Sequence, residues 1–449
     1  KLLLFLHQFY LFTYLSTQYK KNKLQMCGSE EEMREVAGRI CRNYLHGAWK
    51  TVDPRDLDFK RISGGLSNFL YYVALPDSRA TYRDAPQDRI KTLSEHSFLL
   101  DEPKKVLHSP RPRMDYSAGP LSQVLLRIYG QVHGERAMDA IVTESVIFTL
   151  LSERRLGPKL HGVFSGGRIE AYIPARSLLT KELSEPALSM KIAEKMAAIH
   201  SMEVPLSKEP NWLWKTMSKW LRTAREERFT VHDLVRINIE RKIMERLRSV
   251  DWDAEIEWVR KLTNTVNSPV VFCHNDMQEG NVLLEGALVQ TYPLEDSSDS
   301  VSSSLSDIGE PRLMLIDFEY CAYNHRAFDI ANHFQEWSYD YSNSQHPFYF
   351  EFLDQEPTLE QKVKPRIDKR LNNSYANIAS KWIVDAFQPV SDLFWSLWSI
   401  VNASKSQIPF GYWEFALSRL ETYLRLKREL IKKEKCGLPH KRKICEVDI

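Results

Sequence analysis

A polar loop enclosed by two short apolar runs is the feature that most constrains the fold of this chain. Residues 270–284 read VVFCHNDMQEGNVLL, and both ends of this segment are β-prone and apolar. The loop between them carries His274, Asp276 and Asn281. A tight loop between buried strands would direct these side chains toward one point. The segment therefore predicts a strand, a polar loop and a second strand.

A second apolar strand ends in a carboxylate further along the chain. Leu313–Ile316 is followed directly by Asp317, an arrangement that presents an acidic group at a sheet edge. Transfer of a γ-phosphoryl group needs a carboxylate that orients and deprotonates a hydroxyl, together with oxygen ligands for magnesium. Asp276 suits the first task, and Asn281 and Asp317 suit the second. A lone Asp after a strand is usually a cap or turn residue, but all three in this order are much rarer.

Composition excludes several other classes of function. The chain has 449 residues, enough for two domains or lobes around a cleft, and 61 basic residues nearly balance 59 acidic ones. That balance provides no electrostatic footprint for nucleic acid. The six cysteines are widely spaced without a Cys-x-x-Cys pair, which favours a reduced, cytoplasmic protein and argues against zinc or redox motifs.

The ends of the chain and two polar segments are expected to lie outside the packed core. Residues 1–25 are apolar, then basic, and are interpreted as leader-like or extraneous, since they are short for a membrane span. No later segment predicts a transmembrane helix. The proline-repeated segment 76–120 and the Ser/Asp-rich segment 291–311 are interpreted as insertions, and 434–449 as a basic tail.

The remaining pattern predicts an α+β fold with two lobes. A β-rich N-terminal lobe is expected over 26–173 and a larger helical lobe over 174–433. The expected N-terminal elements are helices at Glu30–Tyr44 and Ala140–Arg154, and strands at Phe59–Ile62, Phe69–Leu75, Val124–Tyr129, Leu160–Phe164 and Ile169–Ile173. Helical patterns dominate from Met190 to Thr265 and from Phe328 to Lys433.

Two long sequence segments resemble the choline/ethanolamine kinase family, and its choline branch in particular. They read FCHNDMQEGNVLL and LMLIDFEYCAYNHRAFDIANHFQEW, and shorter similarities extend over most of residues 35–430. The resemblance implies a protein-kinase-like bilobal fold with ATP between the lobes, Asp276 as the catalytic base, and magnesium on Asn281 and Asp317. It further implies transfer of the ATP γ-phosphoryl to the choline hydroxyl, which begins phosphatidylcholine synthesis by that route, and a homodimer.

The expected nucleotide site starts from the turn SGGLSN at residues 63–68. Its glycines let backbone N–H groups approach phosphate, although a Gly-Gly turn alone is more often a simple hairpin. Arg127 is a cation inside an apolar strand, where it would hold the phosphates, with Glu144 as its expected partner; a structural ion pair is the alternative. With the hinge residue Ile173, the residues expected to bind nucleotide are Ser63, Gly64, Gly65, Ser67, Asn68, Arg127, Glu144 and Ile173.

The acceptor pocket must recognise a quaternary ammonium, which has no hydrogen to donate. Aromatic faces and nearby carboxylates are suited to this. Aromatic residues at helical spacing are more often plain core, as expected for Trp382 and Trp413, but the resemblance assigns one set to choline. That set is Tyr320, Glu336, Tyr341, Trp395, Trp398 and Phe415. Phe415 stands where the family tends to have Tyr, and Pro409 where an acidic residue is expected.

Other functions compete with this one. Ethanolamine kinases share the catalytic residues, so ethanolamine is a second expected acceptor. Aminoglycoside-type phosphotransferases share the His-x-Asp motif, but their sequences lack the aromatic residues found here. A non-enzymatic kinase-fold scaffold is disfavoured because Asp276, Asn281, Asp317, Arg127 and Glu144 are all present.

Overall fold

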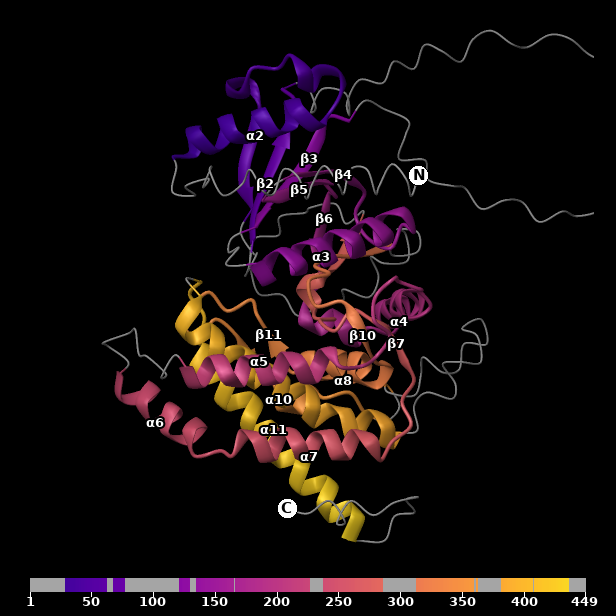
Figure 1. The fold of residues 1–449 in the computed structure, drawn as a ribbon, viewed down its shortest axis with the longest axis vertical. Helices are drawn as coiled ribbons and strands as arrows, with labels where there is room; N and C mark the ends of the chain where they lie inside the picture. Colours follow the sequence, from indigo (N-terminus) through magenta and orange to yellow (C-terminus); the bar gives the residue numbers. More distant parts are fainter. Residues whose placement is uncertain are drawn as a thin grey trace, which may run out of the picture. The chain divides into compact units, whose positions relative to one another are not determined.

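The computed structural model describes ten segments of the chain. They are residues 29–62, 68–76, 121–129, 135–164, 166–226, 237–285, 312–358, 361, 381–406 and 408–435. The chain divides into two compact units, Lys1–Asp139 with Lys159–Tyr172, and Ala140–Pro158 with Ile173–Ile449. Figure 1 labels the helices and strands of both units.

A five-stranded antiparallel sheet forms the first unit. Its order is β1-β2-β3-β5-β4, with bounds β1 (Asp58–Ile62), β2 (Asn68–Ala74), β3 (Gln123–Tyr129), β5 (Gly167–Ala171) and β4 (Leu160–Phe164). Helix α2 (Glu30–Tyr44) begins with a capping box between Ser29 and Glu32, and buries Ala37 and Cys41. These residues share one hydrophobic core with Val73 on β2 and other sheet residues. The short helices η1 (Gly47–Lys50) and η2 (Pro54–Asp56) join α2 to the sheet.

Three small sheets carry the loops of the second unit. The first has the order β6-β8-β9, with bounds β6 (Ala175–Ser177), β8 (Val282–Glu285) and β9 (Arg312–Leu315). The other two pair β7 (Val270–Cys273) with β10 (Ala322–His325), and β11 (Tyr339–Asp340) with β12 (Phe350–Glu351). The short helices are η3 (Thr180–Ser184), η4 (Glu279–Asn281) and η6 (Leu353–Gln355).

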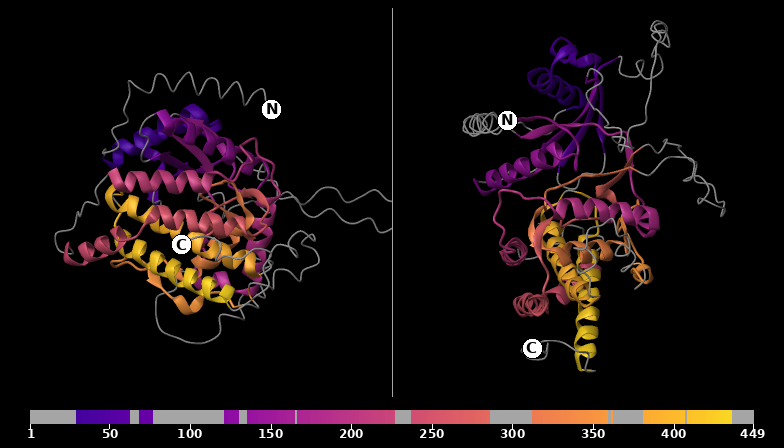
Figure 2. Two further views of the ribbon diagram at one scale, coloured as in Figure 1. Left: turned by 60° about the horizontal axis from the view of Figure 1, so that its bottom comes forward. Right: turned by 90° about the vertical axis from the view of Figure 1, so that its right-hand side faces the viewer.

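Long helices supply the core of the second unit (Figures 1 and 2). They are α3 (Glu135–Glu153, which begins in the first unit), α4 (Pro186–His200), α5 (Trp212–Glu226), α6 (Ile237–Arg248), α7 (Trp252–Asn264), α8 (Arg326–Glu336), α10 (Lys381–Lys405) and α11 (Tyr412–Lys435). Helix α10 packs against α11, α8 and α5. Phe394 of α10 is central to this packing, because its ring lies 4.6 Å from Trp220 of α5 and 5.6 Å from Phe328 of α8, between ring centroids.

Most expected elements are present, with shifted ends. The helix Glu30–Tyr44 has the predicted bounds, whereas α3 begins at Glu135 rather than at Ala140. Strand β5 was expected to reach Ile173 but ends at Ala171. Pro174 has no backbone N–H to donate and restricts the backbone conformation of the residue before it, so the chain leaves the hydrogen-bond ladder of the sheet before Ile173. The sequence did not reveal β6, β10, β11 or β12, which have two to four residues each.

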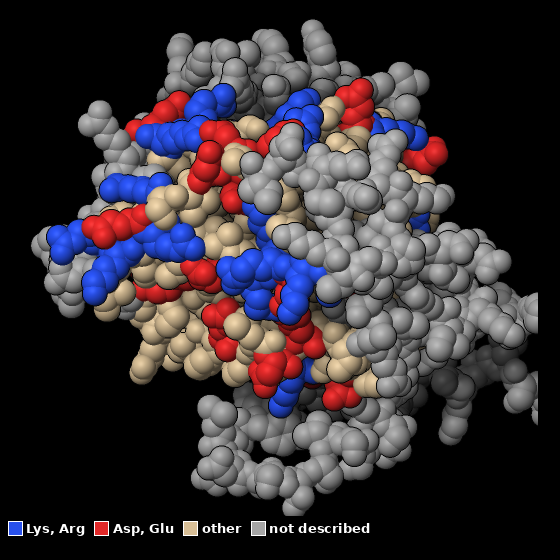
Figure 3. Space-filling view, turned by 90° about the horizontal axis from the view of Figure 1, so that it is seen from below, with Lys and Arg blue, Asp and Glu red and all other residues tan. Residues whose placement is uncertain are grey.

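Several predictions concern residues outside the described segments. They are the leader-like 1–25, nearly all of the insertion 76–120, the Ser/Asp-rich 291–311 and almost the whole tail 434–449. In the part of the chain that the structure describes, no helix combines the length and apolar character of a membrane span. On the face seen in Figure 3, basic and acidic side chains lie among one another.

Candidate active site

The loop after β7 brings the three expected catalytic and metal residues together. Asn281 Nδ2 donates to the backbone carbonyl of Asp276 at 2.9 Å and to Asp276 Oδ2 at 2.8 Å. Strands β8 and β9 pair Val282 with Leu315, and the Ile316 N–H continues this ladder by donating to Asn281 O at 3.1 Å. Asp317 is the next residue, so the ends of two paired strands carry Asn281 and Asp317.

Negative charge accumulates around Asp276. Burial raises the pKa of the Asp276 carboxyl well above its usual value, and the charges of Glu336, Asp317 and Glu319 raise it further. The hydrogen bond from Asn281 acts in the opposite direction. An electrostatic environment of this kind favours cations.

Two residues of the site have left-handed backbone conformations. Asn275 has φ +67° and Asp317 has φ +62°, values that non-glycine residues seldom adopt. The side chain of Asn275 is held at both ends, since Nδ2 donates to Tyr320 O at 2.9 Å and Oδ1 accepts from Asn324 Nδ2 at 2.9 Å. The loop after β7 is thereby tied to the segment that follows Asp317. Residues held in such uncommon conformations cluster at functional sites.

Asp329 holds the loop after β7 through hydrogen bonds, a role that the sequence did not reveal. Its carboxylate accepts from the backbone N–H groups of His274 at 3.0 Å and Asn275 at 2.8 Å, and lies 2.8 Å from His200 Nε2. Burial alone would raise the pKa of Asp329, but these donors lower it. An acidic residue within the apolar helix text AFDIANHF was the available signal.

His274 has a structural position rather than a proton-transfer position. It is fully buried, its Nε2 lies 3.0 Å from Ile316 O, and its ring packs 5.5 Å from that of Phe318. Burial lowers its pKa, so the ring is neutral near pH 7 and donates to the carbonyl. His274 thus fixes the strand end that precedes Asp317.

The aromatic residues expected to bind the phosphoryl-acceptor substrate form one continuous series. The ring of Tyr320 lies 5.5 Å from Trp395, Trp395 lies 5.5 Å from Trp398, Trp398 lies 6.5 Å from Phe415, and Phe415 lies 6.1 Å from Tyr341, between centroids. The helices α10 and α11 and the segments after β9 and α8 contribute these rings.

Asp276 lies at the Tyr320 end of this series. Burial raises the pKa of the Tyr320 hydroxyl well above its usual value, with further contributions from the charges of Glu319 and Asp276. Glu336, whose charge acts on Asp276, lies at the other end, where the Tyr341 hydroxyl donates to Glu336 Oε2 at 2.8 Å. The aromatic series and the carboxylates therefore belong to one site.

Hydrogen bonds fix the orientation of the two tryptophans. Trp398 Nε1 donates to the Tyr320 hydroxyl at 2.9 Å, and Trp395 Nε1 donates to Asn332 Oδ1 at 2.6 Å. Of the tryptophans expected in the core, Trp413 is 5% exposed. The side chain of Trp382 lies outside the described residues.

The expected nucleotide residues are only partly described. Ser63, Gly64, Gly65 and Ser67 lie outside the described segments, as does the side chain of Asn68 at the start of β2. The carbonyl of Ile173 accepts from the Ala175 N–H at 2.9 Å.

Arg127 has a carboxylate partner that the sequence did not reveal. It is 4% exposed, and its Nε lies 3.1 Å from Glu170 Oε1, which also pairs with Arg168 Nε at 2.7 Å. The signal was available, because Arg168 and Glu170 are charges within a strand pattern. The expected partner Glu144 belongs to the other unit, so that pairing stays a prediction.

The donor set fits a hard divalent cation. Because the Asn281 amide nitrogen is committed to Asp276, its carbonyl oxygen is the atom available to a metal ion. Asp317 adds a carboxylate, and Mg²⁺ prefers such oxygen ligands. The charges that raise the pKa of Asp276 would also be offset by a cation.

A second cluster of metal-ligand types does not suit a metal. Ligand atoms of His200, Cys273 and Asp329 lie within 4.8 Å of one another. Burial raises the pKa of the Cys273 thiol well above its usual value, and metal binding needs the thiolate. His200 and Asp329 are also hydrogen-bonded to each other. This cluster is structural.

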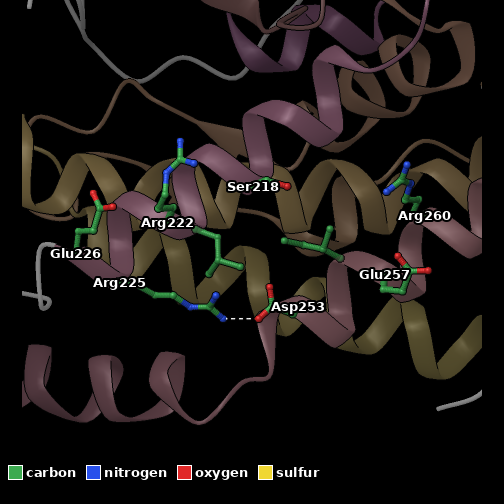
Figure 4. A pocket seen from close by; sticks show the side chains of 9 residues that line it. Ser218, Arg222, Arg225, Glu226, Asp253, Glu257 and Arg260 are labelled. Atoms are coloured by element: carbon green, nitrogen blue, oxygen red, sulfur yellow. Dashed lines mark hydrogen bonds and ion pairs between the residues drawn. The ribbon is translucent and has the colours of Figure 1, made fainter.

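A groove lies between α5 and α7 (Figure 4). Its volume is about 760 Å³, and it is lined by Ser218, Leu221, Arg222, Arg225, Glu226, Asp253, Ile256, Glu257 and Arg260. An ion pair of 2.6 Å joins Arg225 to Asp253 across it. None of the expected catalytic or acceptor residues lines this groove.

Comparison with known proteins identifies the family. The family model described as choline/ethanolamine kinase matches residues 59–424. The chain is 37% identical over 426 residues to a human choline/ethanolamine kinase, covering 92% of this chain and 91% of the relative. The chain belongs to the choline/ethanolamine kinase family. It is an ATP-dependent phosphotransferase that acts on an alcohol.

A further relative and a solved structure are also similar to this chain. Choline kinase A2 of Caenorhabditis elegans is 36% identical over 417 residues, covering 89% of this chain and 87% of the relative. The crystal structure of a choline kinase from Cryptosporidium parvum Iowa II superposes with a TM-score of 0.56 at 23% identity, covering 89% of this chain and 96% of that one. The expected α+β, protein-kinase-like fold is confirmed.

Proposed function

We propose that this chain is a choline kinase, which transfers the γ-phosphoryl group of ATP to the hydroxyl of choline and yields phosphocholine and ADP. The observation that carries this proposal is the continuous aromatic series from Tyr320 to Tyr341, with Asp276 beside one end and Glu336 at the other. Aromatic faces attract a trimethylammonium group that cannot donate a hydrogen bond.

Asp276 serves as the proton acceptor in this proposal. The choline oxygen forms a bond to the γ-phosphorus, the bond from that phosphorus to the β–γ bridging oxygen breaks, and the hydroxyl proton passes to Asp276. Asn281 orients the Asp276 carboxylate through its hydrogen bond to Oδ2.

Asn281 and Asp317 would hold magnesium through side-chain oxygens. Magnesium held there would neutralise charge on the transferred phosphoryl and on the ADP leaving group. On the nucleotide side, we propose that Arg127 contacts phosphate, that Glu144 supports it and that backbone groups of Ile173 contact adenine. The turn residues Ser63, Gly64, Gly65, Ser67 and Asn68 would cover the phosphates. A homodimer and a cytoplasmic location also stay predictions.

Ethanolamine is the second candidate acceptor. The Glu336 carboxylate could accept a hydrogen bond from a primary ammonium, which aromatic faces cannot do. Both oxygens of Glu336 already accept hydrogen bonds from protein groups, however, at 2.5 Å from Arg419 Nη2 and 2.8 Å from the Tyr341 hydroxyl. This arrangement favours the methylated acceptor.

A methylation series tests the proposal. ADP release is measured with ethanolamine, N-methylethanolamine, N,N-dimethylethanolamine and choline, each with ATP and Mg²⁺. We expect kcat/KM to rise with each methyl group, because each one adds apolar contact with the rings and removes a donor. A value that falls along the series would assign the chain to ethanolamine instead.

A further inference from the structure

Arg419 is a fully buried cation between two carboxylates of the second unit. Its Nη2 lies 2.5 Å from Glu336 Oε1, and its Nη1 lies 3.1 Å from Asp392 Oδ1. Arg419 belongs to α11, Glu336 to α8 and Asp392 to α10, so this one guanidinium links three helices. The cluster holds one positive and two negative charges when all three groups are ionised.

The guanidinium also contacts two aromatic rings, of which Phe415 belongs to the aromatic series. Its Cζ lies 3.8 Å from the ring centroid of Tyr339 and 4.9 Å from that of Phe415. Burial alone would lower the pKa of Arg419, but the charge of Glu336 and the neighbouring acidic groups raise it well above its usual value. Arg419 therefore stays charged against the rings, as in a cation–π contact.

Protein donors occupy both oxygens of each carboxylate. Glu336 accepts from Arg419 and from the Tyr341 hydroxyl, and Asp392 accepts from Arg419 and from Gln335 Nε2 at 2.5 Å. Such a network fixes the carboxylate planes in one orientation. Glu336 thus provides negative charge to the acceptor site while each of its two oxygens already accepts a hydrogen bond from a protein group.

We propose that Arg419 is a positioning residue that sets acceptor specificity, because it holds Glu336 on protein donors and so disfavours an acceptor that needs hydrogen-bond partners. A primary ammonium has three donors to satisfy, whereas a trimethylammonium has none. Arg419 therefore favours choline over ethanolamine. This inference rests on the proposed function and goes beyond it by naming the residue that controls the preference.

The test compares variants matched in charge. Burial raises the pKa of Asp392 to about 7, so the assays are run at about pH 8, where its carboxyl is mostly ionised. Arg419→Met combined with Asp392→Asn then removes one positive and one negative charge, so the net charge of the cluster is kept while Glu336 Oε1 loses its partner. Asp392→Asn alone leaves the pair of Arg419 and Glu336 in place and is the control. The quantity measured is the ratio of kcat/KM for choline to kcat/KM for ethanolamine, with KM for ATP measured alongside.

We expect the ratio to fall by about tenfold in the double variant, the effect of one hydrogen bond to a charged group. The change should appear in KM for the acceptors, with KM for ATP unchanged. The control should keep the wild-type ratio within about twofold. A folded double variant with the wild-type ratio would overturn the inference, as would an equal loss for both acceptors.

Arg419→Lys keeps the inference testable if the double variant does not fold. Lysine retains the charge but cannot bridge two carboxylates with a planar fork, so we expect a smaller fall in the same ratio. An unchanged ratio in this variant would contradict the inference. Failure of the wild-type protein to phosphorylate either acceptor would instead contradict the proposed function, so the two failures are distinguishable.

Discussion

Asn281 holds Asp276 by two hydrogen bonds from a single amide nitrogen, to the carboxylate at 2.8 Å and to the backbone carbonyl at 2.9 Å. The proposed base and a proposed magnesium ligand are therefore mechanically coupled. The amide nitrogen of Asn281 restrains the proposed base, and the carbonyl oxygen of the same side chain is the proposed magnesium ligand. A change at either residue will affect both.

Replacing Asp276 with Asn should separate activity from stability. We expect kcat to fall by about 10²–10⁴-fold, because the proton acceptor is lost, while KM for ATP stays within about twofold. The unfolding midpoint of the metal-free protein should stay the same or rise, since the raised pKa shows that the ionised carboxyl is disfavoured there. Steady-state ADP release and thermal unfolding check both parts. A variant with wild-type kcat would remove Asp276 from the mechanism.

Replacing Trp398 with Phe should weaken acceptor binding. The variant keeps a ring but loses the hydrogen bond from Trp398 Nε1 to the Tyr320 hydroxyl, so both rings lose their fixed orientation. Cation–π contacts contribute about 0.5–2 kcal/mol, which corresponds to a rise in KM for choline of about 2–30-fold.

Trp258→Phe is the matched control for this variant. Trp258 is also buried, but it packs against Tyr423 at 6.3 Å and lies outside the aromatic series. It should alter stability without altering KM for choline. If KM for choline were the same in Trp398→Phe and Trp258→Phe, the role of Trp398 would be purely structural.

Replacing Asp329 with Asn should destabilise the protein in a pH-dependent way. Three donors converge on this buried carboxylate, so we expect a loss of about 2–5 kcal/mol in the free energy of unfolding near pH 7. The pKa of Asp329 is lowered from 3.8, so its contribution is present above that pH and is lost as the pH falls below it.

The difference between wild type and Asp329→Asn should therefore narrow below about pH 4. Denaturant unfolding at pH 7 and in acid measures it. The exposed Asp354→Asn serves as the control and should change stability by less than about 0.5 kcal/mol. A difference that is constant with pH would show that the carboxylate charge is not what holds the loop.

Replacing Asp317 with Asn should raise the magnesium requirement. A neutral amide is a weaker ligand for a hard cation, so we expect the Mg²⁺ concentration for half-maximal activity to rise at least about tenfold. Titration of activity with Mg²⁺ at saturating acceptor measures this, and excess chelator should abolish wild-type turnover. An unchanged titration midpoint would place the metal elsewhere.

The local part of the site could be predicted from the sequence, and the long-range part could not. Asp276, Asn281 and Asp317 each sit beside an apolar strand run, so their positions follow from neighbouring residues. Arg419 is a cation four residues after Phe415 on α11, and the sequence gives no means of knowing that Glu336 lies across from it. Its partners come from two other helices, which only the tertiary packing brings together.

The same reason explains Arg127. The sequence predicts that Arg127 lies in a buried strand. The contact of Arg127 with Glu170, however, depends on the pairing of β3 with β5, in which Leu125 lies opposite Glu170. The sequence predicts Glu144, on the following helix, as the partner of Arg127, and this pairing stays a prediction because Glu144 belongs to the other unit. The partner Glu170 requires the register of the sheet.

The most direct test of the account supplies choline and ethanolamine separately to the purified chain with ATP and Mg²⁺, and measures ADP release for the wild type and for Asp276→Asn. We predict phosphocholine formation by the wild type, a higher kcat/KM for choline than for ethanolamine, and near-complete loss of both activities in the variant. ADP release that choline does not stimulate above ATP alone would contradict the account.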